Sequence, residues 1–129
     1  LTSLAQAKLP IEKIKLPPGF QVSVLTDQAP GARSMALSSG GTLFIGTRDA
    51  GRVYAIAHAD TGGSQVVTIA SGLNSPKGGA FREGSLYVAE INRILRFDQI
   101  ESLLQNPPKS VVVTDRYPKD ALCAGRVAL

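Results

Sequence analysis

The sequence nearly repeats itself at an interval of 43 residues, and this repeat constrains the fold more than any other feature. Leu43-Phe44-Ile45 in the first copy corresponds to Leu86-Tyr87-Val88 in the second. Each copy holds four short runs rich in apolar and β-branched residues, separated by turn signals such as Gly40-Gly41 and Glu83-Gly84. A period of about 40–45 residues with four strands per unit is typical of a β-propeller blade. We therefore predict an all-β chain with two four-stranded blades.

The first blade is predicted at 33–75 and the second at 76–120. Their central strands are continuously apolar, which is typical of strands covered on both faces. An alternative is a pair of unrelated meanders in an ordinary β-sandwich. The individual strands are expected at 35–37, 42–47, 52–56 and 66–69 in the first unit, and at 79–81, 85–90, 93–97 and 111–114 in the second.

A short helical insertion is predicted at 98–106, inside the second blade. Asp98-Gln99-Ile100-Glu101 has the Asp-x-x-Glu spacing of a helix capping box. Ile100, Leu103 and Leu104 would form one apolar face, and Asn106-Pro107-Pro108 would end the helix.

The segments outside the two units have separate predictions. Residues 8–32 are expected to hold an N-terminal strand, because Gln21-Val22-Ser23-Val24-Leu25 alternates between apolar and polar residues. Residues 1–7 end in Ala5-x-Ala7, a pattern that signal peptidases cut, so we expect the remnant of a signal peptide there. Residues 121–129 show no strand alternation and no fitting turn, so we expect an aberrant tail.

Composition narrows the classes of partner. The chain has one His and one Cys in 129 residues, which excludes paired-histidine and multi-cysteine metal motifs, and we predict no metal site. Its basic residues give a formal charge of +4 but are scattered without a block, so no nucleic-acid partner is expected. No apolar run approaches the ~20 residues that span a bilayer, so no membrane partner is expected either.

Two blades cannot close a ring, which indicates a piece of a larger propeller.

Four segments stand out in the order in which they occur: Ile14–Phe20, Gly41–Arg48, Asn74–Phe81 and Leu86–Ile94. In sequence and in order, these segments resemble the glucose/sorbosone dehydrogenase family, which includes soluble sugar dehydrogenases dependent on pyrroloquinoline quinone (PQQ) and proteins like L-sorbosone dehydrogenase. The resemblance implies a periplasmic, six-bladed β-propeller that oxidises a sugar or sugar aldehyde with PQQ and calcium. It covers about residues 9–120, roughly the first third of the family's length, and so implies an N-terminal fragment.

The resemblance also places part of the family's active site in this chain. The family's catalytic histidine follows a Lys-Asp or similar pair, and Lys119-Asp120 looks like that pair. However, no histidine follows, so Asp120 would be an orienting residue beside a missing base. The family's quinone-binding side chains and calcium site lie in later blades. The resemblance therefore implies that this chain binds neither PQQ nor calcium alone and is inactive by itself.

Loops at one end of a propeller carry its function, because a rigid scaffold positions them. Among the residues expected there, Asn74 and Lys77 are predicted to contact the substrate. The alternative is that Asn74-Ser75-Pro76 is only a turn and that Arg48 and Glu90 are solvated charges. His58, in a loop, is expected to be solvated. The residues expected near the axis are Arg33, Asn74 and Lys77, and those expected at the rim are Arg48, Asp49, Glu90 and Asn92.

Three functional hypotheses follow. The first is the N-terminal part of a quinoprotein sugar or aldose dehydrogenase of the sorbosone type. The second is a non-catalytic β-propeller binding or interaction fragment that associates with itself through exposed blade edges. The third is a lactonase-like hydrolytic propeller, which would need metal-binding acidic residues that the sequence does not offer.

Overall fold

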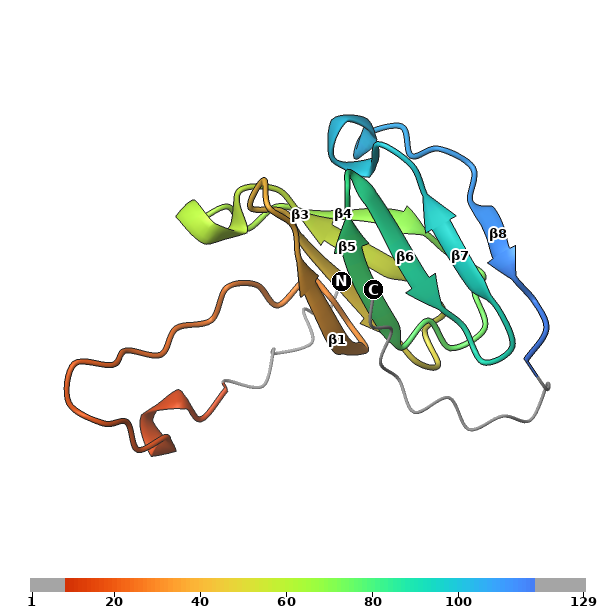
Figure 1. The fold of residues 1–129 in the computed structure, drawn as a ribbon. Helices are drawn as coiled ribbons and strands as arrows, with labels where there is room; N and C mark the ends of the chain where they lie inside the picture. Colours follow the sequence, from red (N-terminus) through yellow and green to blue (C-terminus); the bar gives the residue numbers. More distant parts are fainter. Residues whose placement is uncertain (1–8, 118–129) are drawn as a thin grey trace, which may run out of the picture.

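Two antiparallel sheets of four strands each make up the fold, which a computed structural model describes for residues 9–117 (Figure 1). In each sheet the strands lie side by side in chain order. The first sheet holds β1 (Ala32–Leu37), β2 (Leu43–Thr47), β3 (Val53–Ile56) and β4 (Val66–Ala70). The second sheet holds β5 (Gly78–Arg82), β6 (Ser85–Ala89), β7 (Ile94–Phe97) and β8 (Val111–Thr114). The described residues also form the short 3₁₀ helices η1 (Ile11–Lys13), η2 (Ala59–Thr61) and η3 (Ile100–Leu103).

The predicted all-β class and the predicted positions of the eight strands are confirmed. The tight turns fall at the predicted glycines. Glu83 and Gly84 between β5 and β6 have φ angles of 50° and 82°, as a two-residue hairpin turn of type I′ requires. Gly41, at φ 84°, donates its N–H to the carbonyl of Ser38 at 3.2 Å and closes the turn between β1 and β2.

The two sheets share one pattern of strand pairing, so each position in the first sheet has an equivalent in the second. β1, β2 and β3 pair in the same register as β5, β6 and β7. Side chains in adjacent rows point to opposite faces of a sheet. The equivalent rows across these strands are Leu37/Leu43/Ile56 with Phe81/Leu86/Phe97, Met35/Ile45/Tyr54 with Gly79/Val88/Leu95, and Ala36/Phe44/Ala55 with Ala80/Tyr87/Arg96.

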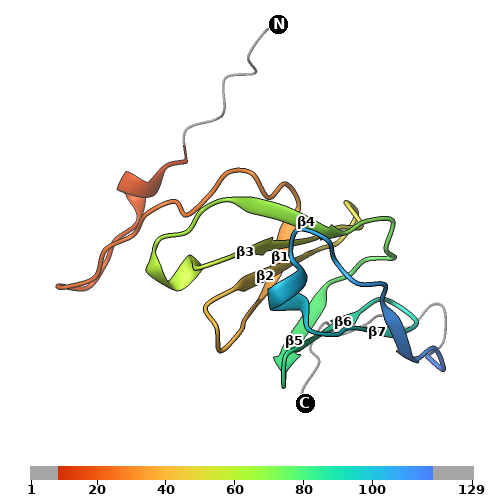
Figure 2. The ribbon, with the colours of Figure 1, turned by 90° about the horizontal axis from the view of Figure 1, so that it is seen from above.

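The core lies between the two sheets, which face each other as seen in Figure 2. Phe44 of β2 stacks on Phe81 of β5, with ring centroids 5.9 Å apart and an angle of 12° between the ring planes. Ile100 and Leu104, at and just after η3, complete this cluster. Burial of these large apolar side chains is the main source of stability. The other buried members are Val53, Ala55, Ile69, Leu86, Val88, Leu95 and Phe97.

Gly46, on β2, lets the first sheet approach the segment just before β5 closely. A Cβ atom at Gly46 would lie 2.3 Å from the backbone oxygen of Pro76, well inside van der Waals contact. Any side chain there would push the segment before β5 away from β2. Gly46, near the end of β2, therefore has a packing role that its low strand propensity does not reveal.

The predicted N-terminal strand within 8–32 is wrong. Residues 21–25 form no strand and extend away from the sheets as an arm, with Phe20, Val22 and Val24 exposed (Figure 1). An alternating sequence becomes a strand only when a neighbour supplies hydrogen-bond partners. Within the described residues these five have none, so the pattern alone was not sufficient.

The helical insertion at 98–106 contains only the 3₁₀ helix η3, and the predicted capping box is wrong. Gln99, not Asp98, precedes η3, and it adopts a left-handed conformation without a side-chain cap. Asp98 is occupied elsewhere: it accepts hydrogen bonds from Arg96 Nε at 2.7 Å and from Ser85 Oγ at 2.9 Å. These partners on β6 and β7 compete with the backbone of the insertion for the same carboxylate.

Removal of the Asp98 charge tests this small network. Hydrogen bonds from Arg96 and Ser85 hold the pKa of Asp98 below its ordinary value of 3.8. The unfolded chain therefore binds more protons in this range, so the stabilisation by Asp98 is present in full above pH 3.8 and is lost as the pH falls through the lower folded value. We expect the difference in urea midpoint between wild type and Asp98→Asn to shrink from about pH 5 to about pH 3. Asp49→Asn, which removes an exposed carboxylate, supplies the background, and a constant difference for Asp98→Asn would contradict the prediction.

None of the helices described is long and apolar enough to cross a bilayer. The predicted signal-peptide remnant at 1–7, the tail at 121–129 and Asp120 all lie outside the described residues.

Candidate functional site

Three loops meet at one end of the two sheets and form the candidate site. They are the β2–β3 loop (48–52), the β4–β5 loop (71–77) and the β6–β7 loop (90–93). Backbone hydrogen bonds join them: Leu73 N–H donates to the carbonyl of Gly51 at 3.0 Å, and Ile91 N–H donates to the carbonyl of Asn74 at 3.2 Å. We call this end of the molecule the loop end. β1 also begins here, because it runs antiparallel to β2.

A buried carboxylate ties two of these loops together. Glu90 follows β6 directly, and its side chain is only 1% exposed. Its Oε2 accepts the backbone N–H of Asn74 at 2.5 Å, and its Oε1 accepts Nε of Arg93 in an ion pair. Both carboxylate oxygens thus have partners, which is what a buried charge needs. The expectation that Glu90 is a rim residue is corrected: it lies in a rim loop but points inward, where it fixes that loop's shape.

The β2–β3 loop is fixed by Thr47, which is fully buried. Its hydroxyl accepts the N–H of Arg52 at 2.9 Å and donates to the carbonyl of the same residue at 2.8 Å. The Thr47 hydroxyl therefore satisfies both backbone groups of Arg52, which strand pairing does not satisfy in this loop. Arg48, which follows Thr47, stays exposed and forms an exposed ion pair with Asp49 at 3.8 Å.

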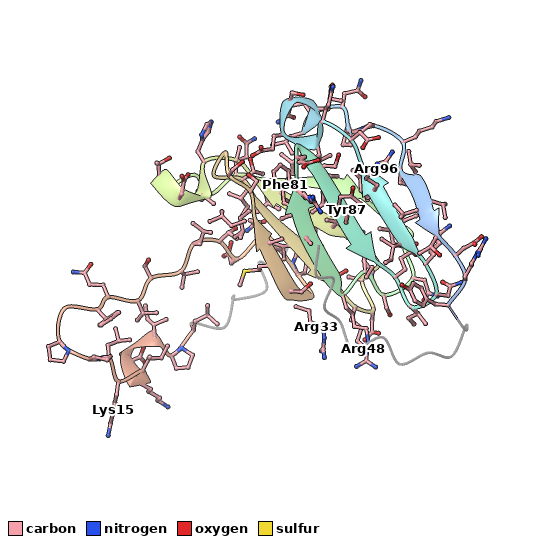
Figure 3. The ribbon with its side chains drawn as sticks, in the orientation of Figure 1. Lys15, Arg33, Arg48, Phe81, Tyr87 and Arg96 are labelled. Carbon is pink, nitrogen blue, oxygen red and sulfur yellow. The ribbon has the colours of Figure 1, made fainter. Side chains whose placement is uncertain are left out.

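The structure brings the predicted site residues to the loop end. Asn74 and Lys77 lie on one loop just before β5, with Asn74 exposed and Lys77 half-buried. The backbone of Asn74 is held on both sides, by Glu90 and by Ile91, which fixes where its side chain emerges. Figure 3 shows Arg33 and Arg48 at this same end.

Positive charge prevails at the loop end. Arg33 and Lys77 form no ion pair with any described residue, whereas Arg48 and Arg93 each face one carboxylate. Exposed cations on rigid loops can donate hydrogen bonds to anionic or oxygen-rich ligands. His58 lies at the opposite end, exposed, before η2.

The role of Glu90 was missed at the level of sequence. A usable signal existed: Glu90 and Arg93 are three residues apart across a predicted tight turn, directly after a fully apolar strand. A carboxylate directly after a buried strand is either exposed to solvent or paired with a nearby cation. Because position 93 is an arginine, pairing of Glu90 with Arg93 is favoured.

Comparisons with known proteins leave the family of this chain open. No family model matches it, and no curated protein matches it. Twelve chains of solved structures match its fold. One is titled Kuenenia stuttgartiensis Hydrazine Synthase; it is 20% identical with a TM-score of 0.49, and the match covers 81% of this chain and 28% of that chain. At that distance the likeness carries no conclusion about activity.

Proposed function

We propose that this chain is the N-terminal part of a periplasmic quinoprotein that oxidises a sugar or a sugar aldehyde, and that its two sheets are consecutive blades of a six-bladed propeller. The observation that carries the proposal is the repeat of one four-stranded unit. The two units lie 43 residues apart in the sequence, which is the length of a propeller repeat, and their strands pair in the same register. The two sheets also pack face to face around one core. The resemblance of Asn74–Phe81 and Leu86–Ile94 to the sugar dehydrogenase family supports it, because these segments supply the loop end and the inner strands.

In this proposal the loop end is one wall of the substrate entrance. Asn74 and Lys77 donate hydrogen bonds to sugar oxygens, and Glu90 holds their loop in place through the Asn74 backbone. Asp120 orients a histidine that this chain does not contain. In this proposal the chain lacks the family's catalytic histidine, and we expect no turnover from the chain alone.

The described residues do not fit a calcium site. Within 9–117, no group of three or more His, Cys, Asp or Glu side chains is placed to hold a metal ion. Calcium prefers six to eight oxygen ligands, which such a group would have to supply in large part. PQQ and calcium therefore belong to the proposal for the longer protein.

The experiment is to sequence the gene beyond the codon for Asp120 and to express the chain that each reading frame encodes. We expect a histidine codon shortly after that position in a shifted frame, followed by further four-stranded repeats. The extended protein, loaded with PQQ and calcium, is expected to reduce an artificial electron acceptor with a sugar or sugar aldehyde, while the 129-residue chain gives no turnover. Absence of such a frame, or turnover by the short chain, would overturn the proposal.

Lys77 and Asn74 can then be tested in the extended protein. Lys77→Ala and Asn74→Ala are each expected to raise KM for the sugar several-fold, since one hydrogen bond to a ligand is worth about 0.5–1.5 kcal/mol. Arg82→Ala, an exposed cation at the opposite end of β5, is the matched control and should leave KM unchanged. If all three variants behave alike, the loop end is not the substrate entrance.

A second candidate function is a non-catalytic interaction fragment, and one observation favours it. β8 is the outer strand of the second sheet, and Val111, Val112 and Val113 are all exposed along it. An exposed apolar edge strand can pair with a strand of another chain. This candidate predicts association that depends on the β8 edge.

A further inference from the structure

The first sheet leaves one apolar face uncovered near its inner strand. Met35 is 68% exposed and Leu37 is 59% exposed, both on β1, and Leu43 on β2 lies beside them. We call Met35, Leu37 and Leu43 the open face. Large apolar side chains grouped in this way on a sheet normally mark a contact surface.

The equivalent positions of the second sheet are packed. Leu37 and Leu43 correspond to Phe81 and Leu86, which contact the first sheet across the core. The open face is therefore the same kind of surface that the second sheet uses to pack on the first. Among residues 9–117, no third sheet lies in front of it.

The second sheet presents the complementary surface. Ala80 on β5 and Tyr87 on β6 lie in the row that faces away from the core, and we call Ala80 and Tyr87 the outward face. They correspond to Ala36 and Phe44, and Phe44 is the residue of the first sheet that receives Phe81. Tyr87 is thus an aromatic side chain in the position of Phe44; it is half-buried, and none of the strands that the structure describes lies opposite it. Figure 3 labels Tyr87 and Phe81 on neighbouring strands.

The N-terminal segment covers only part of this face of the first sheet. Ala29 packs against Ile45, Tyr54 and Ile56, and the Tyr54 hydroxyl donates to the carbonyl of Pro30 at 3.1 Å. A groove of about 220 Å³ remains between this segment and the inner strands. Its lining includes Met35, Leu43 and Leu25. Within the chain, the contact between sheets also runs through the inner strands β1, β2 and β5, so the part left uncovered is the part needed for stacking.

We propose that, where the 129-residue chain occurs without further blades, a second copy docks its outward face on the open face, so that copies associate head to tail. In the longer protein of the proposed function, the neighbouring blades would take these two places. The occupant is argued from the molecule itself, because Tyr87 has the position of Phe44 and Leu37 has the position of Phe81 in the contact already present between the two sheets. The rows are not identical: Arg96 replaces Ala55, and Met35 replaces Gly79. The two surfaces differ, so the interface is heterologous, and a docked pair retains one free surface of each kind. Propellers have about four to eight blades, so a closed assembly holds about two to four copies.

The test uses two variants of the full chain, each of which removes one surface. Leu37→Asp places a charge on the open face, and Tyr87→Asp places one on the outward face. Both side chains are accessible to solvent, and circular dichroism is used to check that each variant folds. We expect wild type to increase in mass with concentration in sedimentation experiments and each variant alone to be a monomer. An equimolar mixture of the two should form a dimer that grows no further, since one intact surface of each kind remains.

The matched control is Val112→Asp on β8, which charges the exposed sheet edge and leaves both faces intact. It is expected to associate as wild type does. Loss of association in Val112→Asp with retention in Leu37→Asp would show edge pairing and would overturn the proposal. So would a wild-type chain that stays monomeric at high concentration, or a mixture of the two face variants that forms no dimer.

A crosslinking experiment gives an independent readout if a face variant does not fold. In a Cys123→Ser background, Leu37→Cys and Tyr87→Cys proteins are mixed and treated with a short thiol crosslinker. Crosslinks are expected between the two proteins and not within either one alone. Self-crosslinking of Leu37→Cys would show a symmetric interface and contradict the head-to-tail arrangement. None of these outcomes depends on PQQ or on sugar oxidation, so the inference and the proposed function fail separately.

Discussion

Replacement of Phe44 by alanine is expected to lower the free energy of unfolding by about 3–5 kcal/mol, because it opens a cavity in the core between the sheets. Phe44 is 2% exposed and stacks on Phe81, so its removal affects packing on both sides. Typical domains have total stabilities of only about 5–15 kcal/mol, so much of the protein would unfold at moderate temperature. Urea denaturation monitored by circular dichroism measures the change.

Phe20→Ala is the matched control for this variant. The same side chain is removed, but Phe20 lies on the arm and is 69% exposed, so a change within about 0.5 kcal/mol is expected. A double-mutant cycle between Phe44→Ala and Phe81→Ala should give a coupling of about 0.5–1.5 kcal/mol from the stacked rings. Equal effects of Phe44→Ala and Phe20→Ala would mean that the two sheets do not share a core.

Replacement of Glu90 by alanine is expected to cost about 2–3 kcal/mol of stability, because it removes a buried carboxylate that accepts two hydrogen bonds. The backbone N–H of Asn74 loses its acceptor, and the guanidinium of Arg93 loses its counter-charge. The loop before β5 should loosen locally as well. Urea denaturation gives the global change, and hydrogen exchange at the Asn74 amide reports the local one.

Glu83→Ala provides the comparison for Glu90→Ala. Glu83 is exposed and faces Arg82 at 3.6 Å in a surface pair, which is worth about 0–1 kcal/mol at most. The amide of Asn74 should exchange faster in Glu90→Ala and at the wild-type rate in Glu83→Ala. If the two variants lose the same stability, Glu90 has no role in holding the loop end.

The strands and their turns were predictable from sequence because their signals are local. Alternation, β-branched residues and glycine turns such as Glu83-Gly84 lie within a few positions of one another, and the internal repeat supplies each strand with a second instance. The expected loop end followed from the same pattern, since strand order determines which loops share an end. Asn74 and Lys77 were therefore placed on the correct loop.

The failures all involve a distant or competing partner. The alternation at Gln21–Leu25 predicted a strand, but pairing depends on a neighbour that the local sequence does not name. Asp98 had the spacing of a cap, but Ser85, 13 residues earlier, takes part of its hydrogen-bonding capacity. Glu90 was expected at the rim, with a solvated charge as the alternative, but the backbone of Asn74, 16 residues away, makes it a buried acceptor. Long-range polar partners of this kind are set by the tertiary fold.

The use of opposite faces by the two sheets has an evolutionary consequence. A unit that receives its neighbour on one face and presents the other face to the next can be copied in tandem by gene duplication, and each new copy arrives with both of its contacts already encoded. Had the two sheets met through equivalent faces, a third copy would have found no complementary surface, and growth would have stopped at two. The packing of Phe81 on Phe44 rather than on Leu37, its own equivalent, therefore makes repeat number a heritable variable that can change by one whole unit in a single genetic event.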